Sequence, residues 1–244
     1  MNHYARLAAL CLLATGLATA QNPPPPNPPR ASQTESEQEI QKKEQSQRIL
    51  GVVPMFGVTS RQNPPPLTPG QKFRLFVKGS VDPFNFVAAG IQAGIGQAGD
   101  EFSEYGQGAE GYGKRYGAAF ADSVSSGLFS GFFYPVLLKQ DPRYFRLGEG
   151  KVRHRIGYSL AQQLVCRKDS GGRTFNFSNV LGAVSAGGLS NAYYPPSDRG
   201  FGLTMSRAAI SLIYGSAGGL IDEFWPDIRR KVFHKKKDSP PPDH

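Results

Sequence analysis

Apolar and small residues recur at helical spacing through most of the chain after residue 68. The central stretch is residues 107–138, which begins with glycines and ends in the uncharged block 128–138. The same spacing predicts further helices, over residues 83–98, 151–168, 180–194 and 200–224. Residues 73–77 and 174–177 are too short to give a clear strand alternation. The pattern therefore predicts an all-α fold.

Two helix starts are marked by capping residues. Thr68, Pro69 and Gln71 have the spacing of a capping box with proline at the first helical position. Asp82 followed by Pro83 repeats the combination of a capping side chain and a proline. Both signals predict a helix that begins at the proline.

Pairs of small residues lie four positions apart in four of the predicted helices. A step of four returns to the same helix face, and small side chains there let a second backbone come close. We expect a compact bundle of about five to six helices, packed through such small-xxx-small grooves. The predicted packing positions are Gly90, Gly94, Gly113, Gly117, Gly127, Gly131, Ala183, Gly187, Gly215 and Gly219.

Residues 117–138 are long enough to cross a bilayer and carry one charge, Asp122. Four serines dilute the apolarity of this stretch, and a carboxylate is costly in lipid, so we expect a buried core helix instead. Arg207 is likewise isolated on an apolar helix. Asp122 and Arg207 are therefore predicted to form a buried polar pair that sets helix register.

The amino-terminal region reads as export and linker sequence. Residues 1–20 contain a positive charge, a short apolar run and an Ala-Thr-Ala cleavage pattern, which together predict a secretory signal. Residues 21–48 are rich in Pro, Gln, Glu, Ser and Lys and are predicted to form a disordered linker. A helical domain is expected over 49–232, with a basic, proline-containing tail at 233–244. The expected location is the periplasm or the outer membrane.

The net charge of +9 favours anionic partners. For an exported chain these are membrane lipids or envelope proteins, and nucleic acid is not expected. A segment near the carboxyl terminus combines aromatic and basic residues as membrane-interface segments do. It comprises Phe224, Trp225, Arg229, Arg230 and Lys231.

Candidate chemistry is sparse. Cys166 is the single cysteine outside the predicted signal, and no zinc-type or Gly-x-Ser-x-Gly motif is present, so we expect no metal and no cofactor. The Gly-x-Gly-x-x-Gly match at 106–111 follows no predicted strand. Asp141, Arg143 and His154 are the weak catalytic candidates, as an acid–base group near a cation. The alternative is structural, with Asp141 capping a turn and Arg143 pairing with an acid.

Four segments resemble a family of bacterial secreted or envelope proteins of unknown function. They are residues 107–115, 141–145, 169–177 and 223–228. The resemblance implies a secreted single domain and implies no activity.

The leading hypothesis is a non-enzymatic cell-envelope protein with a membrane-associated structural or interaction role. One alternative is an envelope hydrolase or lipid-handling enzyme that uses Asp141, Arg143 and His154. Another is a soluble periplasmic module that binds an apolar ligand in an inter-helix cavity.

Overall fold

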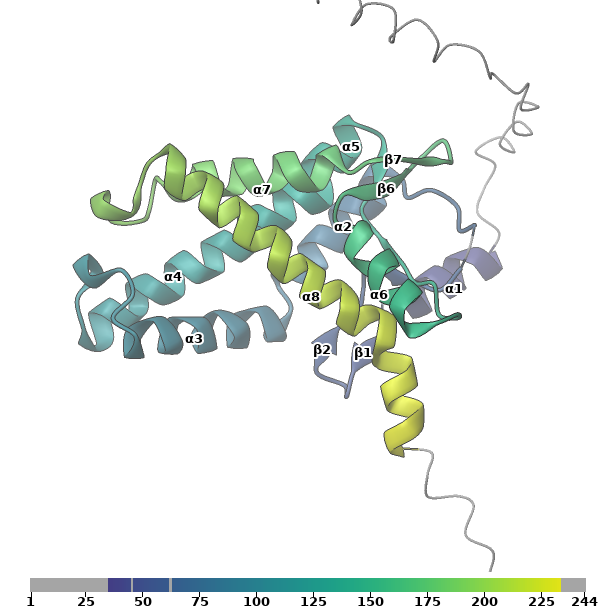
Figure 1. The fold of residues 1–244 in the computed structure, drawn as a ribbon, viewed down its shortest axis with the longest axis horizontal. Coiled ribbons are helices and arrows are strands. Elements are labelled where there is room, and N and C mark those ends of the chain that lie inside the picture. Colours follow the sequence, from purple (N-terminus) through teal and green to yellow (C-terminus); the bar gives the residue numbers. More distant parts are fainter. Residues whose placement is uncertain (1–34, 45, 62, 234–244) are drawn as a thin grey trace, which may run out of the picture. The chain divides into compact units, whose positions relative to one another are not determined.

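Helices make up most of the chain that the structure describes, as predicted from the apolar spacing (Figure 1). The computed structural model describes residues 35–44, 46–61 and 63–233. The predicted signal, residues 1–20, and nearly all of the predicted tail lie outside these ranges. The helices are α1 (Glu35–Glu44), α2 (Pro69–Ser80), α3 (Pro83–Ala98), α4 (Gly108–Ser126), α5 (Tyr134–Leu137), α6 (Val152–Ala161), α7 (Phe177–Ser190) and α8 (Phe201–Phe233).

The capping signals begin their helices as predicted. Thr68 Oγ1 accepts a hydrogen bond from the backbone N–H of Gln71, and the Gln71 side chain accepts one from the N–H of Thr68. The Asp82 carboxylate accepts from the N–H of Phe84 at 2.9 Å. Each bond satisfies a donor that the first helical turn leaves free, so α2 and α3 start at Pro69 and Pro83.

The predicted helix over 107–138 is divided into three parts. A π-helical segment, η3 (Gly127–Phe133), lies between α4 and the single turn of α5. Pro135 has no N–H to donate, and the helix ends within a few residues of it. π-Helical turns are rare and often occur at functional positions. The segment contacts both α2 and α7.

Short strands join parts of the chain that are distant in sequence. They are β1 (Arg48–Ile49), β2 (Val53–Pro54), β3 (Val58–Thr59), β4 (Gln140–Asp141), β5 (Tyr144–Phe145), β6 (Val165–Lys168) and β7 (Arg173–Phe175). The β1–β2 pair is antiparallel, β3 pairs in parallel with β5, and β6 lies between β4 and β7 in an antiparallel sheet.

Three boundaries differ from the prediction. The helix expected over 151–168 ends at Ala161, because residues 165–168 pair with β7 across a turn in which Gly171 and Gly172 have positive φ. The last helix continues to Phe233 with Pro226 inside it. Part of the predicted linker forms α1, where Gln41 accepts a hydrogen bond from Gln71 and Glu44 pairs with Arg61.

The helix contacts bury small side chains, and many large apolar side chains face outward. Ala89, Ala93, Ala118, Ala183 and Ala208 are among the buried residues of α3, α4, α7 and α8. Large side chains meet in a small cluster of Ile49, Met55 and Val58, against which Trp225 packs. No helix within the described ranges is both long and apolar enough to cross a membrane.

The predicted small-residue positions fall into two groups. Ala183 is buried, and a methyl group added at Gly90, Gly127, Gly187, Gly215 or Gly219 would lie within 3.4 Å of a neighbouring residue. Such a group at Gly94, Gly113, Gly117 or Gly131 would meet no atom within 4 Å. These four glycines therefore do not form close helix contacts, because no neighbouring atom is near enough to touch an added methyl group, and Gly131 borders the cavity beside α2.

Two glycines outside the predicted set make closer contacts. A methyl group at Gly182 would lie 2.2 Å from Ser130 Oγ, and one at Gly111 would lie 2.1 Å from the Gly106 carbonyl oxygen. Gly182 and Ala186 are both buried and lie four positions apart. The small-residue step could therefore have identified Gly182.

Candidate functional site

A cluster around Glu223 joins α8 to α6 and to the segment after β5. The Glu223 side chain has no exposed surface. It accepts hydrogen bonds from Arg155 Nε at 2.8 Å, from the Tyr144 hydroxyl at 3.0 Å and from two backbone N–H groups, those of Leu147 and Gly148. Arg155 also donates to the Glu223 carbonyl oxygen. We call these residues, with Asp227, the glutamate cluster.

The charged groups of the glutamate cluster form hydrogen bonds with one another. Asp227 accepts a bond from Arg155 Nη1, so the guanidinium is shared between two carboxylates one helical turn apart. Burial acts to raise the pKa of the Asp227 carboxyl, but hydrogen bonds from Arg155 and Arg230 together outweigh it and hold the pKa below its usual range. Burial raises the pKa of the Tyr144 phenol. Both Glu223 oxygens already accept bonds, and the arrangement clamps α6 against α8.

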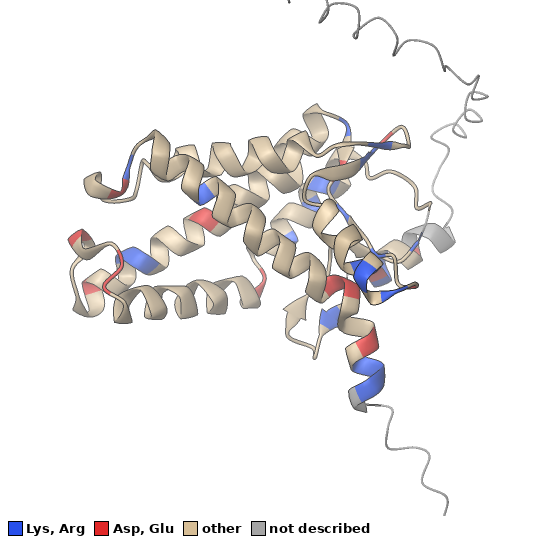
Figure 2. Ribbon diagram, in the orientation of Figure 1, with Lys and Arg blue, Asp and Glu red and all other residues tan. Residues whose placement is uncertain are grey.

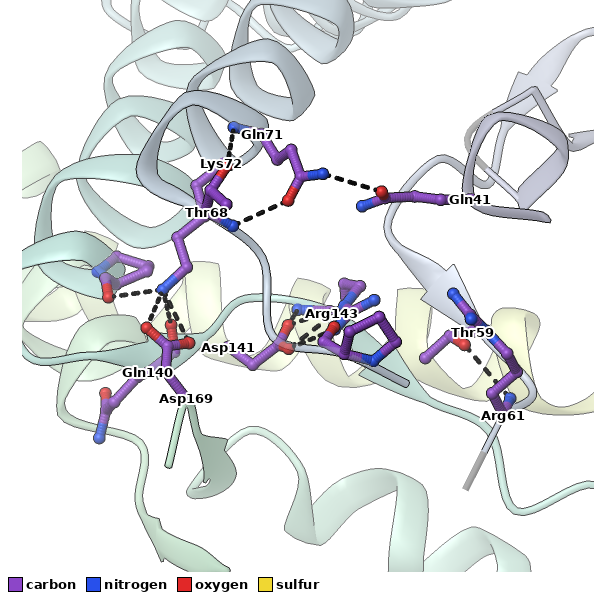
Figure 3. A network of polar contacts seen from close by, with 12 residues as sticks. Gln41, Thr59, Arg61, Thr68, Gln71, Lys72, Gln140, Asp141, Arg143 and Asp169 are labelled. Carbon is purple, nitrogen blue, oxygen red and sulfur yellow. Dashed lines mark hydrogen bonds and ion pairs between the residues drawn. The ribbon is translucent and has the colours of Figure 1, made fainter. Parts of the chain in front are cut away.

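A second cluster surrounds the buried ammonium group of Lys72 (Figure 3). Lys72 Nζ donates to the Pro135 and Gln140 carbonyl oxygens at 3.0 and 2.8 Å, and it contacts the Asp169 carboxylate at 2.7 Å. The Gln140 side chain in turn accepts from the N–H and hydroxyl of Ser178. This lysine cluster connects α2, α5, β4, the β6–β7 turn and α7.

The predicted catalytic candidates do not come together as a set. Arg143 Nε and Nη2 donate to the Asp141 carboxylate, and Nη2 also donates to the Pro65 carbonyl oxygen (Figure 3). Both side chains are buried. His154 is exposed on α6, and among the described residues no hydrogen bond or ion pair joins it to either of them. The Asp141–Arg143 pair fits the structural alternative.

Asp122 and Arg207 both contact Tyr194. No direct ion pair between the two residues occurs among the described side chains. Asp122 accepts bonds from the hydroxyls of Tyr193 and Tyr194 at 2.5 and 2.6 Å. The Arg207 guanidinium lies 4.0 Å from the Tyr194 ring centre and donates to Ser190 Oγ and the Asp198 carbonyl oxygen. Burial raises the pKa of the Asp122 carboxyl, while the two tyrosine hydroxyls oppose the shift.

The glycine-rich segment 106–111 forms a tight backbone contact. Arg115 donates to the carbonyl oxygens of Glu101 and Gly106, each at 2.7 Å, and to that of Phe102. Gly111 lies against the Gly106 carbonyl, where no side chain fits. The segment therefore holds the α3–α4 connection closed around one arginine.

The aromatic and the basic residues of the predicted membrane interface differ in exposure to solvent. Trp225 packs against the Ile49 cluster, and the Phe224 ring lies 4.4 Å beneath the Arg155 guanidinium, so both rings face other parts of the protein. Arg229, Arg230 and Lys231 are exposed at the end of α8, where Figure 2 shows the charged residues of this helix gathered. The aromatic half of the predicted interface is thus half-buried.

Two cavities have different linings. One of about 300 Å³ lies beside η3 and α2, with Leu75, Phe76, Gly127 and Gly131 among its lining residues. This largely apolar space is the feature that fits an apolar ligand. The other, of about 100 Å³, lies between α6 and the β6–β7 hairpin and is lined in part by Arg167 and Arg173. No group of three His, Cys, Asp or Glu side chains suited to a metal was found in the described residues.

Sequence reasoning missed the anchoring roles of Lys72 and Glu223. Lys72 stands in the apolar stripe of α2, and a lysine in such a stripe is a usable signal for a buried ammonium group. The four segments behind the family resemblance supply Arg115, Asp141, Asp169 and Glu223, one to each network described above apart from the Asp122 network.

Comparison with protein-family models, with curated proteins and with solved structures gave no match to this chain. The family resemblance stays a prediction, and function is argued from the geometry.

Proposed function

We propose that this is a non-enzymatic protein of the cell envelope that associates with membrane lipid through the outward faces of α3 and α8. The observation that carries the proposal is the placement of large apolar side chains on those faces. Ile91 and Ile95 of α3 are 60% and 64% exposed, and Ile213 and Tyr214 of α8 are 67% and 73% exposed. Ile91 and Ile95 lie four positions apart and share one face of α3, and exposed apolar side chains that gather on one face are typical of an interaction site.

Charge distribution supports the same proposal. Helix α3 contains no charged residue, and residues 201–221 of α8 contain only Arg207 (Figure 2). Arg207 points toward Tyr194 and Ser190 of neighbouring segments, which leaves the exposed side chains of this part of α8 uncharged. A face of this kind lowers its free energy by contact with acyl chains at about 25 cal/mol per Å² of apolar surface removed from water.

The buried networks favour a scaffolding role over a catalytic one. The carboxylates of Glu223, Asp141 and Asp169 all accept bonds from cationic side chains. A general base needs a carboxylate or imidazole within reach of a substrate proton, whereas these groups are turned toward their own partners. The envelope location follows from the predicted export signal and is part of the proposal.

Vesicle flotation with purified protein tests the lipid contact. We expect the protein to float with phosphatidylcholine vesicles, and Ile95→Glu combined with Ile213→Glu to reduce the bound fraction at least about tenfold, because each buries a charge in the apolar layer. The matched control is Val152→Glu, at an equally exposed apolar residue on the charged amino-terminal turn of α6. Equal flotation of the double variant and the native protein would reject this surface.

A further inference from the structure

The larger cavity, of about 300 Å³, is bordered by α2, the end of α4 and the π-helical segment η3. Its lining includes Leu75 and Phe76 of α2 and Gly127 and Gly131 of η3, and no described residue that lines it carries a charge. An apolar cavity of about 150 Å³ already accepts benzene, and small-molecule sites range from about 300 to 1,000 Å³. The cavity therefore has room for a slender apolar ligand.

Two glycines keep part of this space unfilled. Gly79 of α2 and Gly131 of η3 both line the cavity, and a methyl group at either would meet no atom within 4 Å. Neither residue has a positive φ, so the backbone does not require glycine at these positions. Larger side chains there would take up part of the cavity volume. Gly131 also belongs to a π-helical segment, and such segments often occur at functional positions.

Aromatic contacts hold one wall of the cavity in place. The Phe76 ring stacks on Phe132 with ring centres 6.3 Å apart, and Phe132 meets the Phe73 ring edge-on at 5.1 Å. A methyl group at Gly127 would lie 3.4 Å from the Phe76 ring, so this ring lies directly against η3. These contacts fix Phe76 at the wall of the cavity.

The polar groups of the lining are neutral, and two of them are bonded to Asn85. Ser123 Oγ donates to Asn85 Oδ1 at 2.6 Å, and Asn85 Nδ2 donates to the Ser80 carbonyl oxygen at 3.1 Å. A charged group inside the cavity would find no ion partner among the lining residues and would lose its hydration. The cavity therefore favours the uncharged, apolar part of a ligand.

The cavity lies next to the start of α3. The Ser123–Asn85 bond joins its lining to the first turn of this helix, and the exposed Val81 connects the end of α2 to α3. Val87 is exposed and lies four positions before Ile91, on the face that we propose contacts lipid. A bilayer against this face would bring acyl chains close to the cavity.

We propose that the cavity binds one acyl chain of a membrane phospholipid, with the head group left outside. The uncharged lining disfavours the head group, and a volume of about 300 Å³ is too small for a two-chain lipid. This inference rests on the lipid contact proposed above, which supplies the chain. It adds a specific site for the chain within the protein, apart from the outward faces of α3 and α8.

Calorimetric titration of the purified chain with lauroyl-lysophosphatidylcholine, kept below its critical micelle concentration, tests the site. We expect saturable binding with a negative heat-capacity change, which marks burial of apolar surface. Glycerophosphocholine, which has the same head group and no acyl chain, should not bind. Gly131→Leu should weaken binding of the lysolipid at least about tenfold, because its side chain occupies the cavity.

The matched control is Gly113→Leu. Gly113 is a helical glycine that also meets no atom within 4 Å, but it does not line the cavity, so affinity should stay within about twofold of native. Circular dichroism and the melting temperature check that Gly131→Leu is folded. Gly79→Leu fills the cavity from α2 and serves as a second variant with the same expected loss.

Vesicle flotation separates this proposal from the lipid contact on which it rests. Gly131→Leu keeps the exposed side chains of α3 and α8 and should still float, whereas Ile95→Glu combined with Ile213→Glu should still bind the monomeric lysolipid. Native affinity in both folded leucine variants, or no saturable binding by the native protein, overturns the cavity proposal. Binding that depends on Gly131 in a protein that does not float would reject the lipid-contact function and support the cavity.

Discussion

Glu223 carries its charge at a position without solvent contact because four donors from three parts of the chain converge on it. Lys72 is the cationic counterpart, with two carbonyl oxygens and one carboxylate around its ammonium group. Taking such groups out of water is costly, and only complete hydrogen bonding offsets the cost. At the residue scale the protein therefore depends on saturated polar anchors.

Asp222, next to Glu223, contrasts with these anchors. Burial raises the pKa of its carboxyl from 3.8 to about 7, and no hydrogen bond or ion pair to it was found in the described part of the chain. The native state thus holds a proton that the unfolded chain releases between pH 4 and pH 7. Stability from this group is present at low pH and is lost as pH rises through that window.

We therefore predict that Asp222→Asn stabilises the protein at pH 8, by about 2 kcal/mol after allowance for partial exposure. At pH 5 the gain should be much smaller, because the native carboxyl is then already protonated. Urea unfolding at both pH values measures the difference. Glu149→Gln, at an exposed acid, serves as the control and should show no such pH dependence. A gain for Asp222→Asn that is the same at both pH values would refute the assignment.

Residue-scale sequence reasoning succeeded where a signal is local. The Thr68 and Asp82 caps follow from two or three adjacent residues and were predicted. The partners of Asp122 were not, because Tyr193 and Tyr194 lie about seventy positions away and a tyrosine carries no sign of what its hydroxyl will bond. Pairing of Asp122 with Arg207 was the natural charge-based expectation, and Tyr194 stands between them.

At the element scale, the same small residue has opposite effects on neighbouring helices. Gly182 of α7 lies against the backbone of Ser130 in η3, which lets the two segments approach closely. Gly113 of α4 faces open space, where it contributes only the conformational freedom that glycine loses on folding. Sequence spacing alone cannot distinguish the two, because it gives the period of a face and not what covers it.

Substitution of Gly182 and of Gly113 by alanine should change the free energy of unfolding in opposite directions. Gly182→Ala forces a methyl group into Ser130 and is expected to cost about 1–3 kcal/mol. Gly113→Ala, in an exposed helix interior, is expected to stabilise by about 0.5–1 kcal/mol. Thermal and urea unfolding of the two variants provide the comparison. The packing account fails if Gly182→Ala melts at or above the native temperature.

Element types were predicted better than element ends. The helical periodicity identified α3, α7 and most of α8. Residues 165–168 were predicted as helix and form β6, because tertiary pairing with β4 and β7 overrides local preference in a four-residue segment. The two-residue strands β1, β2, β3 and β5 are set by partners distant in the sequence and left no pattern to detect.

At the scale of the whole molecule, exposed apolar side chains and net positive charge could each contribute to the membrane contact that we propose. The chain carries a net charge of +9, which attracts anionic head groups over a screening length of about 10 Å at 0.1 M salt and about 3 Å at 1 M. Contact through the isoleucines of α3 and α8 does not depend on salt in this way. The two contributions can therefore be separated by ionic strength.

We predict that most of the protein bound to phosphatidylcholine vesicles that contain an added anionic lipid stays bound when sodium chloride is raised from about 0.1 to 1 M. Salt that screens charge does not weaken the burial of apolar side chains. Vesicle sedimentation across the salt series measures the retained fraction, and a polylysine-coated tracer bound to anionic vesicles calibrates the electrostatic response. Release to background at 1 M would assign attachment to the basic residues.

The parallel pairing of β3 with β5 sets an order for folding. Val58 aligns with Tyr144 and Thr59 with Phe145. The two strands are more than eighty positions apart in the sequence, so neither can form until both have been synthesised. Closing so long a loop has an entropic cost that nearby helix contacts do not incur. The α3–α4 hairpin and the α7–α8 pair can therefore form early, and β3 can pair with β5 only after residue 145 has left the ribosome.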